Sequence, residues 1–232
     1  TINKSIKSSI DFVKEKVEHA EERSPFGNKV EIVAVTKTRP FNYITDIYDL
    51  GFRSIGENRV KEAIDKFQSI EKMPNIKKRF IGHLQSNKVK KCVAAFDTID
   101  SIHSIKTLKK VSRECERTEK TIEILLEVNT SREKQKKGFQ PDNLQEIVSC
   151  FEIPNINITG LMTMAPYTKN EKVIRTSFSL LRNIKDNVNK ILGENRIKEL
   201  SMGMSNDFET AIEEGSTQIR LGTVLFGSRK KE

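Results

Sequence analysis

The 232-residue sequence has no tryptophan, only three cysteines, and no apolar run near the roughly 20 residues that a membrane-spanning helix needs. Cys92, Cys115 and Cys150 are widely separated and lack metal-ligand spacing, which is typical of reduced thiols in an intracellular protein. The three histidines are also isolated, so a His/Cys metal centre has no support. Since the N-terminus lacks a signal-peptide core, we expect a cytoplasmic protein without a membrane segment.

Positive charge is abundant but not concentrated. The chain carries 41 Lys and Arg against 32 Asp and Glu, a net charge of +9, and most lysines are scattered over stretches of helical pattern. Nucleic-acid-binding proteins usually gather basic residues on one face and interleave aromatic residues, which make up only 6% here. A solvated basic surface is the favoured interpretation, and RNA binding is kept as an alternative.

The clearest buried strand runs from Val30 to Lys37. Its apolar, mostly β-branched residues show little alternation, which indicates a strand buried on both faces. Because Pro40 bars its predecessor from the helical region and suits a first helical turn, we expect the strand to end there and a helix to follow. Lys37 is then at the carboxyl end of a buried strand, where α/β folds bind ligands. On this stretch alone, a lysine reaching solvent is the simpler explanation.

Strand and helix patterns alternate along the rest of the chain. An amphipathic helix carrying Ile6, Ile10, Val13 and Val17 comes first, ends before Ser24, and should cover the outside of the fold. Eight strands are predicted, over residues 30–37, 52–55, 78–83, 97–103, 121–129, 156–162, 199–201 and 217–220. Helices are predicted over 41–50, 59–70, 104–117, 173–192 and 206–214, with two more beginning at Ser86 and Pro141. This count predicts one (β/α)8 TIM-type barrel over residues 1–232, with a doubly wound open sheet as the alternative.

In a barrel, the carboxyl ends of the strands share one rim. The residues predicted there are Lys37, Asn58, His83, Asn129, Met162 to Ala165, Ser201 and Arg220. Two loops on this rim resemble anion sites, because small residues lead into a helix start whose backbone N–H groups are unpaired. One is Met202 to Ser205, followed by Asn206 and Glu209 at capping-box separation, and the other is Arg220 to Thr223. Two ordinary helix caps would give the same pattern.

A lysine at a buried strand end and a phosphate-binding rim suit a phosphorylated aldehyde that forms an imine with the lysine. Pyridoxal phosphate (PLP) is such a molecule. Six ordered segments resemble the pyridoxal phosphate homeostasis protein family, and together they span the chain from about residue 3 to 229. They are Ala34–Lys37, Ile55–Arg59, Phe80–Lys88, Gly160–Ala165, Leu200–Asp207 and Arg220–Gly227.

This resemblance implies a single barrel similar to the N-terminal domain of alanine racemase, of fold type III among PLP proteins. It further implies that Lys37 holds the cofactor as a Schiff base, that Asn58 lies beside the ring hydroxyl, and that Arg220 faces the pyridine nitrogen or the phosphate. The other implied cofactor-binding residues are Met202, Ser205, Gly222 and Thr223, with Val35, His83, Met162, Ser201 and Tyr167 around them.

The function implied is that of a PLP carrier that buffers and delivers the cofactor in vitamin B6 homeostasis, with little or no turnover. Alanine racemase takes a catalytic tyrosine from a second domain, for which the sequence ending at Glu232 leaves no room. We expect a monomer that serves PLP-dependent apo-enzymes as recipients. A small PLP-dependent amino-acid racemase or decarboxylase is the alternative.

Overall fold

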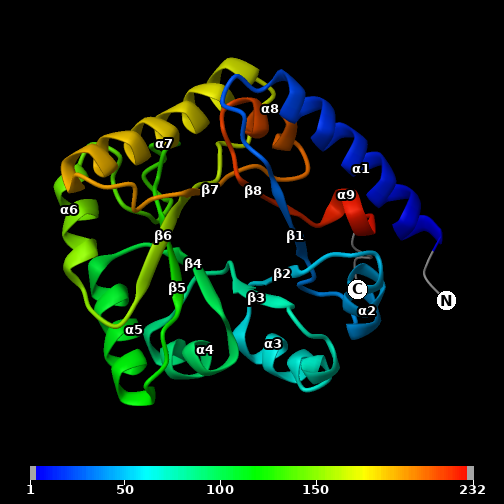
Figure 1. Cartoon of the computed structure of the whole chain (residues 1–232), viewed down its shortest axis with the longest axis horizontal. Coiled ribbons are helices and arrows are strands. Elements are labelled where there is room, and N and C mark those ends of the chain that lie inside the picture. Colours follow the sequence, from blue (N-terminus) through cyan, green and yellow to red (C-terminus); the bar gives the residue numbers. More distant parts are fainter. Residues whose placement is uncertain (1–3, 229–232) are drawn as a thin grey trace.

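The fold is a closed barrel of eight parallel strands. A computed structural model describes residues 4–228, and in it each strand pairs with the next while β8 pairs with β1 (Figure 1). The strands are β1 (Glu31–Val35), β2 (Ser54–Glu57), β3 (Lys77–Phe80), β4 (Thr98–Ile102), β5 (Glu123–Glu127), β6 (Asn157–Met162), β7 (Glu199–Ser201) and β8 (Gln218–Leu221). The barrel prediction is confirmed, and the open sheet is wrong.

Closure joins the two ends of the chain in one sheet. β1 and β8 pair in parallel with Val33 opposite Arg220 and Ala34 opposite Leu221. Val33 and Ala34 are fully buried, as the β-branched run predicts, whereas Glu31 at the start of β1 is exposed. This pairing brings the end of β1, and with it Lys37, beside the loop that follows β8.

Helices surround the strands (Figure 1). They are α1 (Lys4–Arg23), α2 (Phe41–Asp49), α3 (Val60–Phe67), α4 (Val89–Ala95), α5 (Ile105–Thr118), α6 (Leu144–Ser149), α7 (Glu171–Leu192), α8 (Phe208–Glu213) and α9 (Thr223–Phe226). Short 3-10 turns occur at Ile70–Lys72, Ser86–Lys88 and Cys150–Glu152.

At two of the helix starts that differ from the prediction, a 3-10 turn or a side-chain cap precedes the helix. Ser86 begins a 3-10 turn without a side-chain cap, and α4 starts only at Val89. The helix predicted to start at Pro141 begins at Leu144 instead, where Asn143 Oδ1 accepts the backbone N–H of Glu146 at 3.3 Å. An asparagine whose side chain accepts such a bond is a favourable N-cap.

The first helix covers the barrel as predicted. Its Ile6, Ile10, Val13 and Val17 recur at three- and four-residue spacing and are all buried. In Figure 1, α1 runs along the outside of the barrel beside α8 and α9. The helix therefore protects the sheet where β1 and β8 meet.

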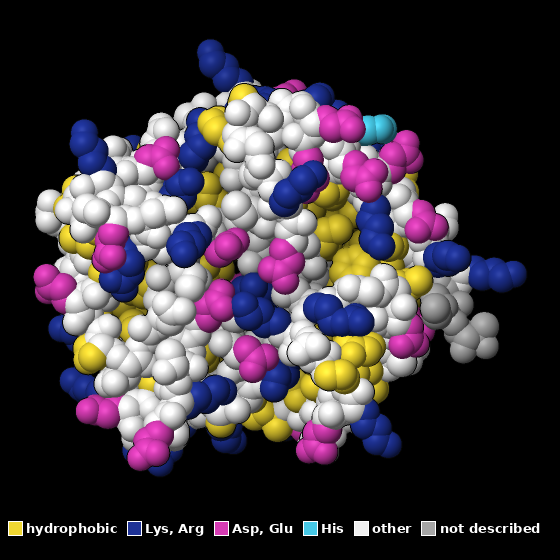
Figure 2. Space-filling model, in the orientation of Figure 1, with side chains coloured by type: hydrophobic (Ala, Val, Ile, Leu, Met, Phe, Trp, Pro, Cys, Tyr) yellow, Lys and Arg dark blue, Asp and Glu magenta, His cyan; other side chains and the backbone are white. Residues whose placement is uncertain are grey.

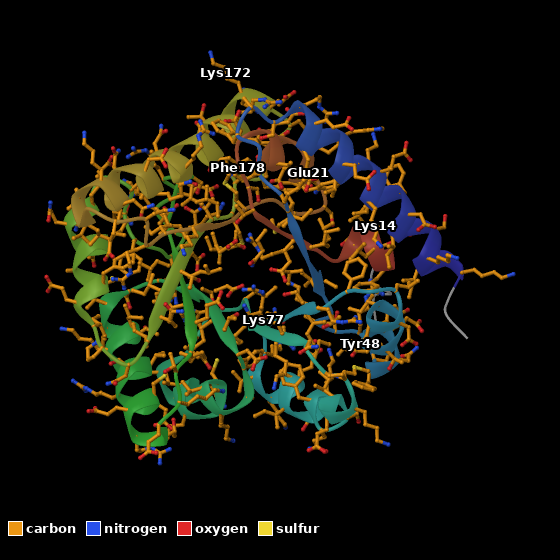
Figure 3. The ribbon with its side chains drawn as sticks, in the orientation of Figure 1. Lys14, Glu21, Tyr48, Lys77, Lys172 and Phe178 are labelled. Atoms are coloured by element: carbon orange, nitrogen blue, oxygen red, sulfur yellow. The ribbon has the colours of Figure 1, made fainter. Side chains whose placement is uncertain are left out.

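The long helix α7 has a defined cap at each end. Asn170 Oδ1 accepts the N–H groups of Lys172 and Val173 at the start, and Gly193 ends the helix in the left-handed region with φ +70°. Phe178 points from the helix toward the strands, whereas Lys172 extends away from the molecule (Figure 3). The amphipathic pattern thus fixes which face of α7 packs on the barrel.

Charges of both signs are mixed on the surface. The face in Figure 2 shows basic and acidic side chains side by side rather than a one-signed field. Within residues 4–228, no helix has the length and apolar character to cross a membrane.

Candidate functional site

One cavity of about 1150 Å³ collects residues from the loops after β1, β6, β7 and β8. All four loops follow the carboxyl ends of their strands, which is the rim where barrels bind ligands. Seven of the residues predicted from the sequence line it, namely Val35, Lys37, Tyr167, Ser205, Arg220, Gly222 and Thr223. The lining also includes Met164 and Ala165, from the predicted rim stretch Met162 to Ala165, and Met204, from the predicted loop Met202 to Ser205. Arg39, Ile81 and Lys136 line it too and were not singled out from the sequence.

Lys37 lies in a turn, half-buried, two residues beyond the end of β1. The predicted strand end at Lys37 is therefore too late by two residues. Thr36 N–H still donates to the carbonyl of Gly56 at 3.1 Å, so the chain stays against β2 up to that point. The turn that follows directs the backbone to Pro40, which precedes the first residue of α2 as predicted.

The loops after β7 and β8 meet, as the sequence predicts. Ser205 Oγ accepts the backbone N–H of Val224 at 3.2 Å, which joins the first loop to α9. The predicted capping box does not form. α8 begins at Phe208, and Asp207 Oδ1 instead accepts the N–H of Met204 at 2.7 Å. The hydroxyl groups of Ser205 and Thr223 both face the same cavity.

Arg220 is a fixed cation at the floor of this cavity. Its Nη1 donates to Ser201 Oγ at 2.6 Å and its Nη2 to the carbonyl of Thr163 at 2.9 Å. Burial lowers the pKa of Arg220 from its ordinary value, while nearby Asp100 and Glu127 act in the opposite direction. Because both terminal nitrogens are held by protein groups, the guanidinium has one defined orientation.

A polar column continues below Arg220 through the barrel interior. Gln218 Nε2 donates to Ser201 Oγ and to Asp100 Oδ2, both at 3.1 Å. Arg79 Nη1 reaches the same Asp100 at 3.2 Å, and Arg79 Nε donates to Ser54 Oγ at 2.9 Å. These bonds pair most of the buried polar atoms of the column, as a core requires, but Gln218 Oε1 has no partner among the described residues. Sequence pattern missed the column, although Asp100 interrupts the apolar run of its strand.

Glu127 is a second acidic group close to Arg220. It ends β5, is half-buried, and lies opposite Met162 in the sheet. Burial raises the pKa of Glu127 to about 7, although Arg220, Lys136 and Lys137 act to lower it. The side chain therefore changes its charge near neutral pH. The sequence offered no signal for this beyond a charged residue at a strand end.

Five of the predicted residues lie outside the cavity lining, namely Asn58, His83, Met162, Ser201 and Met202. Met162, Ser201 and Met202 are fully buried, and Ser201 reaches the cavity only through its bond to Arg220. Asn58 is half-buried, and its buried Oδ1 has no hydrogen-bond partner among the described residues. A hydroxyl group of a bound ligand at this point would donate the hydrogen bond that Asn58 Oδ1 lacks.

His83 was predicted to be the last residue of the third strand. β3 ends at Phe80, three residues earlier, so His83 lies beyond the strand and outside the lining. The exposed His83 ring lies 4.8 Å from that of His103, and its Nε2 is 2.8 Å from Lys137 Nζ. Among residues 4–228, no group of three or more His, Cys, Asp or Glu side chains has the arrangement of a metal site.

Tyr167 stands at the mouth of the cavity with 96% of its surface exposed. Met164 and Met204 are exposed beside the same opening. None of the three is buried against the barrel, so the mouth has an apolar, accessible edge.

Comparison with known proteins gives consistent matches. Residues 9–230 match the family model "Alanine racemase, N-terminal domain". A pyridoxal phosphate homeostasis protein of Aquifex aeolicus is 36% identical over 220 residues, covering 94% of this chain and 96% of that protein. The structure of PipY from Synechococcus elongatus with PLP bound has a TM-score of 0.81 and 32% identity, covering 92% of this chain and 99% of PipY.

An alanine racemase of Clostridium difficile shares the fold alone. Its TM-score is 0.74 at 14% identity, and the match covers 96% of this chain but 57% of the racemase.

Proposed function

The chain belongs to the pyridoxal phosphate homeostasis protein family, built on the alanine racemase N-terminal domain, and on that premise we propose that it binds PLP and acts in its homeostasis. The single observation that carries the proposal is that Lys37, Arg220 and the paired loops after β7 and β8 share one cavity. An amine, a fixed cation and hydroxyl groups with backbone N–H donors match the aldehyde, the ring and the phosphate of PLP.

Each residue has a distinct part in this proposal. Lys37 would hold the cofactor, since its amine would condense with the aldehyde of PLP, forming a C=N bond and releasing one water molecule. Ser205, Gly222 and Thr223 receive the phosphate, since they lie where the two loops meet. Asn58, whose Oδ1 has no partner among the described residues, would accept a hydrogen bond from the ring hydroxyl of PLP. Val35 lines the same cavity, and Met162 and Met202 are buried behind its lining.

Arg220 argues for low turnover. When PLP is bound, its protonated pyridine ring withdraws electrons from an attached amino acid. If Arg220 faces the pyridine nitrogen rather than the phosphate, its guanidinium would disfavour protonation of that nitrogen and so weaken this withdrawal. Arg220 can take this place because Ser201 and Thr163 hold it at the cavity floor.

The exposed edge of the cavity suggests delivery. Met164, Tyr167 and Met204 form an apolar rim from which PLP could pass to a PLP-dependent apo-enzyme. In this proposal the chain is a carrier, active as a monomer in the cytoplasm.

The test is a visible spectrum of the purified protein after incubation with PLP, followed by borohydride reduction and peptide mapping. We expect a yellow protein with a phosphopyridoxyl group on Lys37, and no label at this position in Lys37→Ala. A colourless protein that stays unlabelled would overturn the proposal.

A small racemase or decarboxylase is the second candidate, because this barrel also occurs in alanine racemase. It requires product formation from an amino acid at ordinary enzyme rates, lost in Lys37→Ala. Chiral chromatography after incubation with each of the twenty amino acids separates the two functions. RNA binding, the third candidate, requires a gel shift at low salt that disappears as salt is raised.

A further inference from the structure

The turn that carries Lys37 has an unusual backbone. Thr38, the next residue, has φ +63°, in the left-handed region that β-branched residues avoid. Its N–H donates to Glu62 Oε1 on α3 at 2.5 Å. A conformation of this kind persists only where surrounding contacts hold it in place.

A single ammonium group holds both sides of the turn. Lys66 Nζ donates to the carbonyl of Thr36 at 2.8 Å and to Glu62 Oε1 at 2.7 Å. It also donates to Glu57 Oε1, at the end of β2, at 2.9 Å. The residues before and after Lys37 are thus both connected to Lys66, one directly and one through Glu62.

This cluster is buried enough for its bonds to be strong. The side chain of Lys66 is 10% exposed and that of Glu57 is fully buried. Burial raises the pKa of Glu57 above its ordinary value, although Thr36 and Lys66 act to lower it. Burial also acts to raise the pKa of Glu62, but the bonds from Lys66 and Thr38 outweigh it, so the pKa is lowered. Removing one member of such a cluster leaves buried charge without a partner.

Anchoring α3 to the barrel does not account for these contacts. The bond to Glu57 alone would join α3 to β2. The bonds to Thr36 O and, through Glu62, to Thr38 N–H act on the backbone on either side of Lys37 instead. The Thr36 hydroxyl also donates to Glu57 Oε1 at 2.6 Å, which is a second contact holding the residue before Lys37.

We propose that Lys66, together with Glu57 and Glu62, is a positioning group that holds the strained turn and so sets where the Lys37 amine meets the aldehyde of PLP. The inference rests on the proposed function. Lys66 itself does not touch the cofactor; it acts through Lys37.

The test compares Lys66→Met with Lys120→Met. Lys120 is also half-buried, and its Nζ donates to the carbonyls of Val93 and Phe96, remote in sequence from this turn. PLP affinity is measured by absorbance titration, the labelled fraction of Lys37 by borohydride reduction and mapping, and folding by circular dichroism. We expect Lys66→Met to weaken PLP binding at least tenfold and to reduce the labelling, whereas Lys120→Met stays within twofold of wild type even if its melting temperature falls.

Glu62→Gln is a second test of the positioning role, and it applies even if Lys66→Met does not fold. Its amide oxygen can still accept from Thr38 N–H, but the charge that pairs with Lys66 is lost. We expect Glu62→Gln to lose PLP affinity threefold or more. When Lys66→Met folds, we expect Lys66→Arg to keep part of the affinity that Lys66→Met loses. A folded Lys66→Met or Glu62→Gln with wild-type affinity and labelling would overturn the positioning role. An unlabelled wild-type protein would instead overturn the proposed function.

Discussion

Arg220 Nη1 donates a hydrogen bond to Ser201 Oγ at 2.6 Å, and Gln218 Nε2 donates to the same oxygen at 3.1 Å. The Ser201 hydroxyl therefore connects the floor of the cavity to the polar column below it. Since Ser201 is fully buried, no solvent is at hand to replace it as an acceptor.

Ser201→Ala should lower the free energy of unfolding by about 1–3 kcal/mol, because it leaves two buried donors without this acceptor. Urea unfolding measures the change. Ser9→Ala serves as the control, since the Ser9 hydroxyl bonds only on the exposed surface of α1, to the carbonyl of Ser5. Equal changes in the free energy of unfolding would show that the buried Ser201 hydroxyl stabilises the fold no more than an exposed one.

Thr38→Gly should stabilise the protein by about 1 kcal/mol. Glycine adopts φ +63° without the steric cost that Thr38 bears, and this relief exceeds the entropy that glycine adds to the unfolded chain. Thermal unfolding without PLP measures the gain. Thr176→Gly, inside α7, should be destabilising by about 0.3 kcal/mol, because glycine is a poorer helix former than threonine. A loss of stability in Thr38→Gly would show that the turn is not strained.

Glu127 should make stability depend on pH. Its pKa is raised from 4.5 to about 7 by burial, so the folded protein holds this proton more tightly than the unfolded chain does. The free energy of unfolding should therefore fall as pH rises from about 4.5 to 7, by on the order of 3 kcal/mol from this group.

Glu127→Gln removes this contribution. Urea unfolding at pH 5 and pH 8 should show a smaller decrease for the variant than for the wild type. The comparison uses the difference between the two proteins, so titration of other groups cancels. Parallel pH profiles would mean that Glu127 keeps its ordinary pKa in the fold.

Gly82→Ala should destabilise the protein by about 2 kcal/mol or more. A Cβ at this position would lie 2.3 Å from the carbonyl oxygen of Asn58, and backbone atoms cannot move aside cheaply. Gly222→Ala is the matched control, since its nearest neighbour, Val35 Cβ, would be 3.4 Å away, an ordinary contact. Thermal unfolding of both variants tests the prediction, which fails if Gly82→Ala is the milder change.

The sequence was most informative where local pattern and tertiary environment agree. The β-branched run of β1 predicts a buried strand, and the spacing of Ile6, Ile10 and Val13 predicts the face on which α1 packs. The loops after β7 and β8 were also predicted to meet, because strand order in a barrel fixes their neighbourhood.

The parts that escaped prediction depend on partners distant in sequence. Lys66 looks like any surface lysine of an amphipathic helix, and only the fold shows that it bonds to Thr36 and Glu57. His83 was expected at the site as the last residue of the predicted third strand, yet β3 ends at Phe80 and the His83 ring lies beside that of His103. The family resemblance included Glu57 within a motif but assigned it no role.

The pairing of β1 with β8 has a consequence for how the protein is made. Lys37 is synthesised well before Arg220, Gly222 and Thr223, and only barrel closure brings the four residues to one cavity. A nascent chain therefore carries the lysine long before it can form the site. PLP in hundredfold excess over its dissociation constant would then stabilise only the closed barrel, by about 2.7 kcal/mol. Cofactor uptake would report that the barrel has closed.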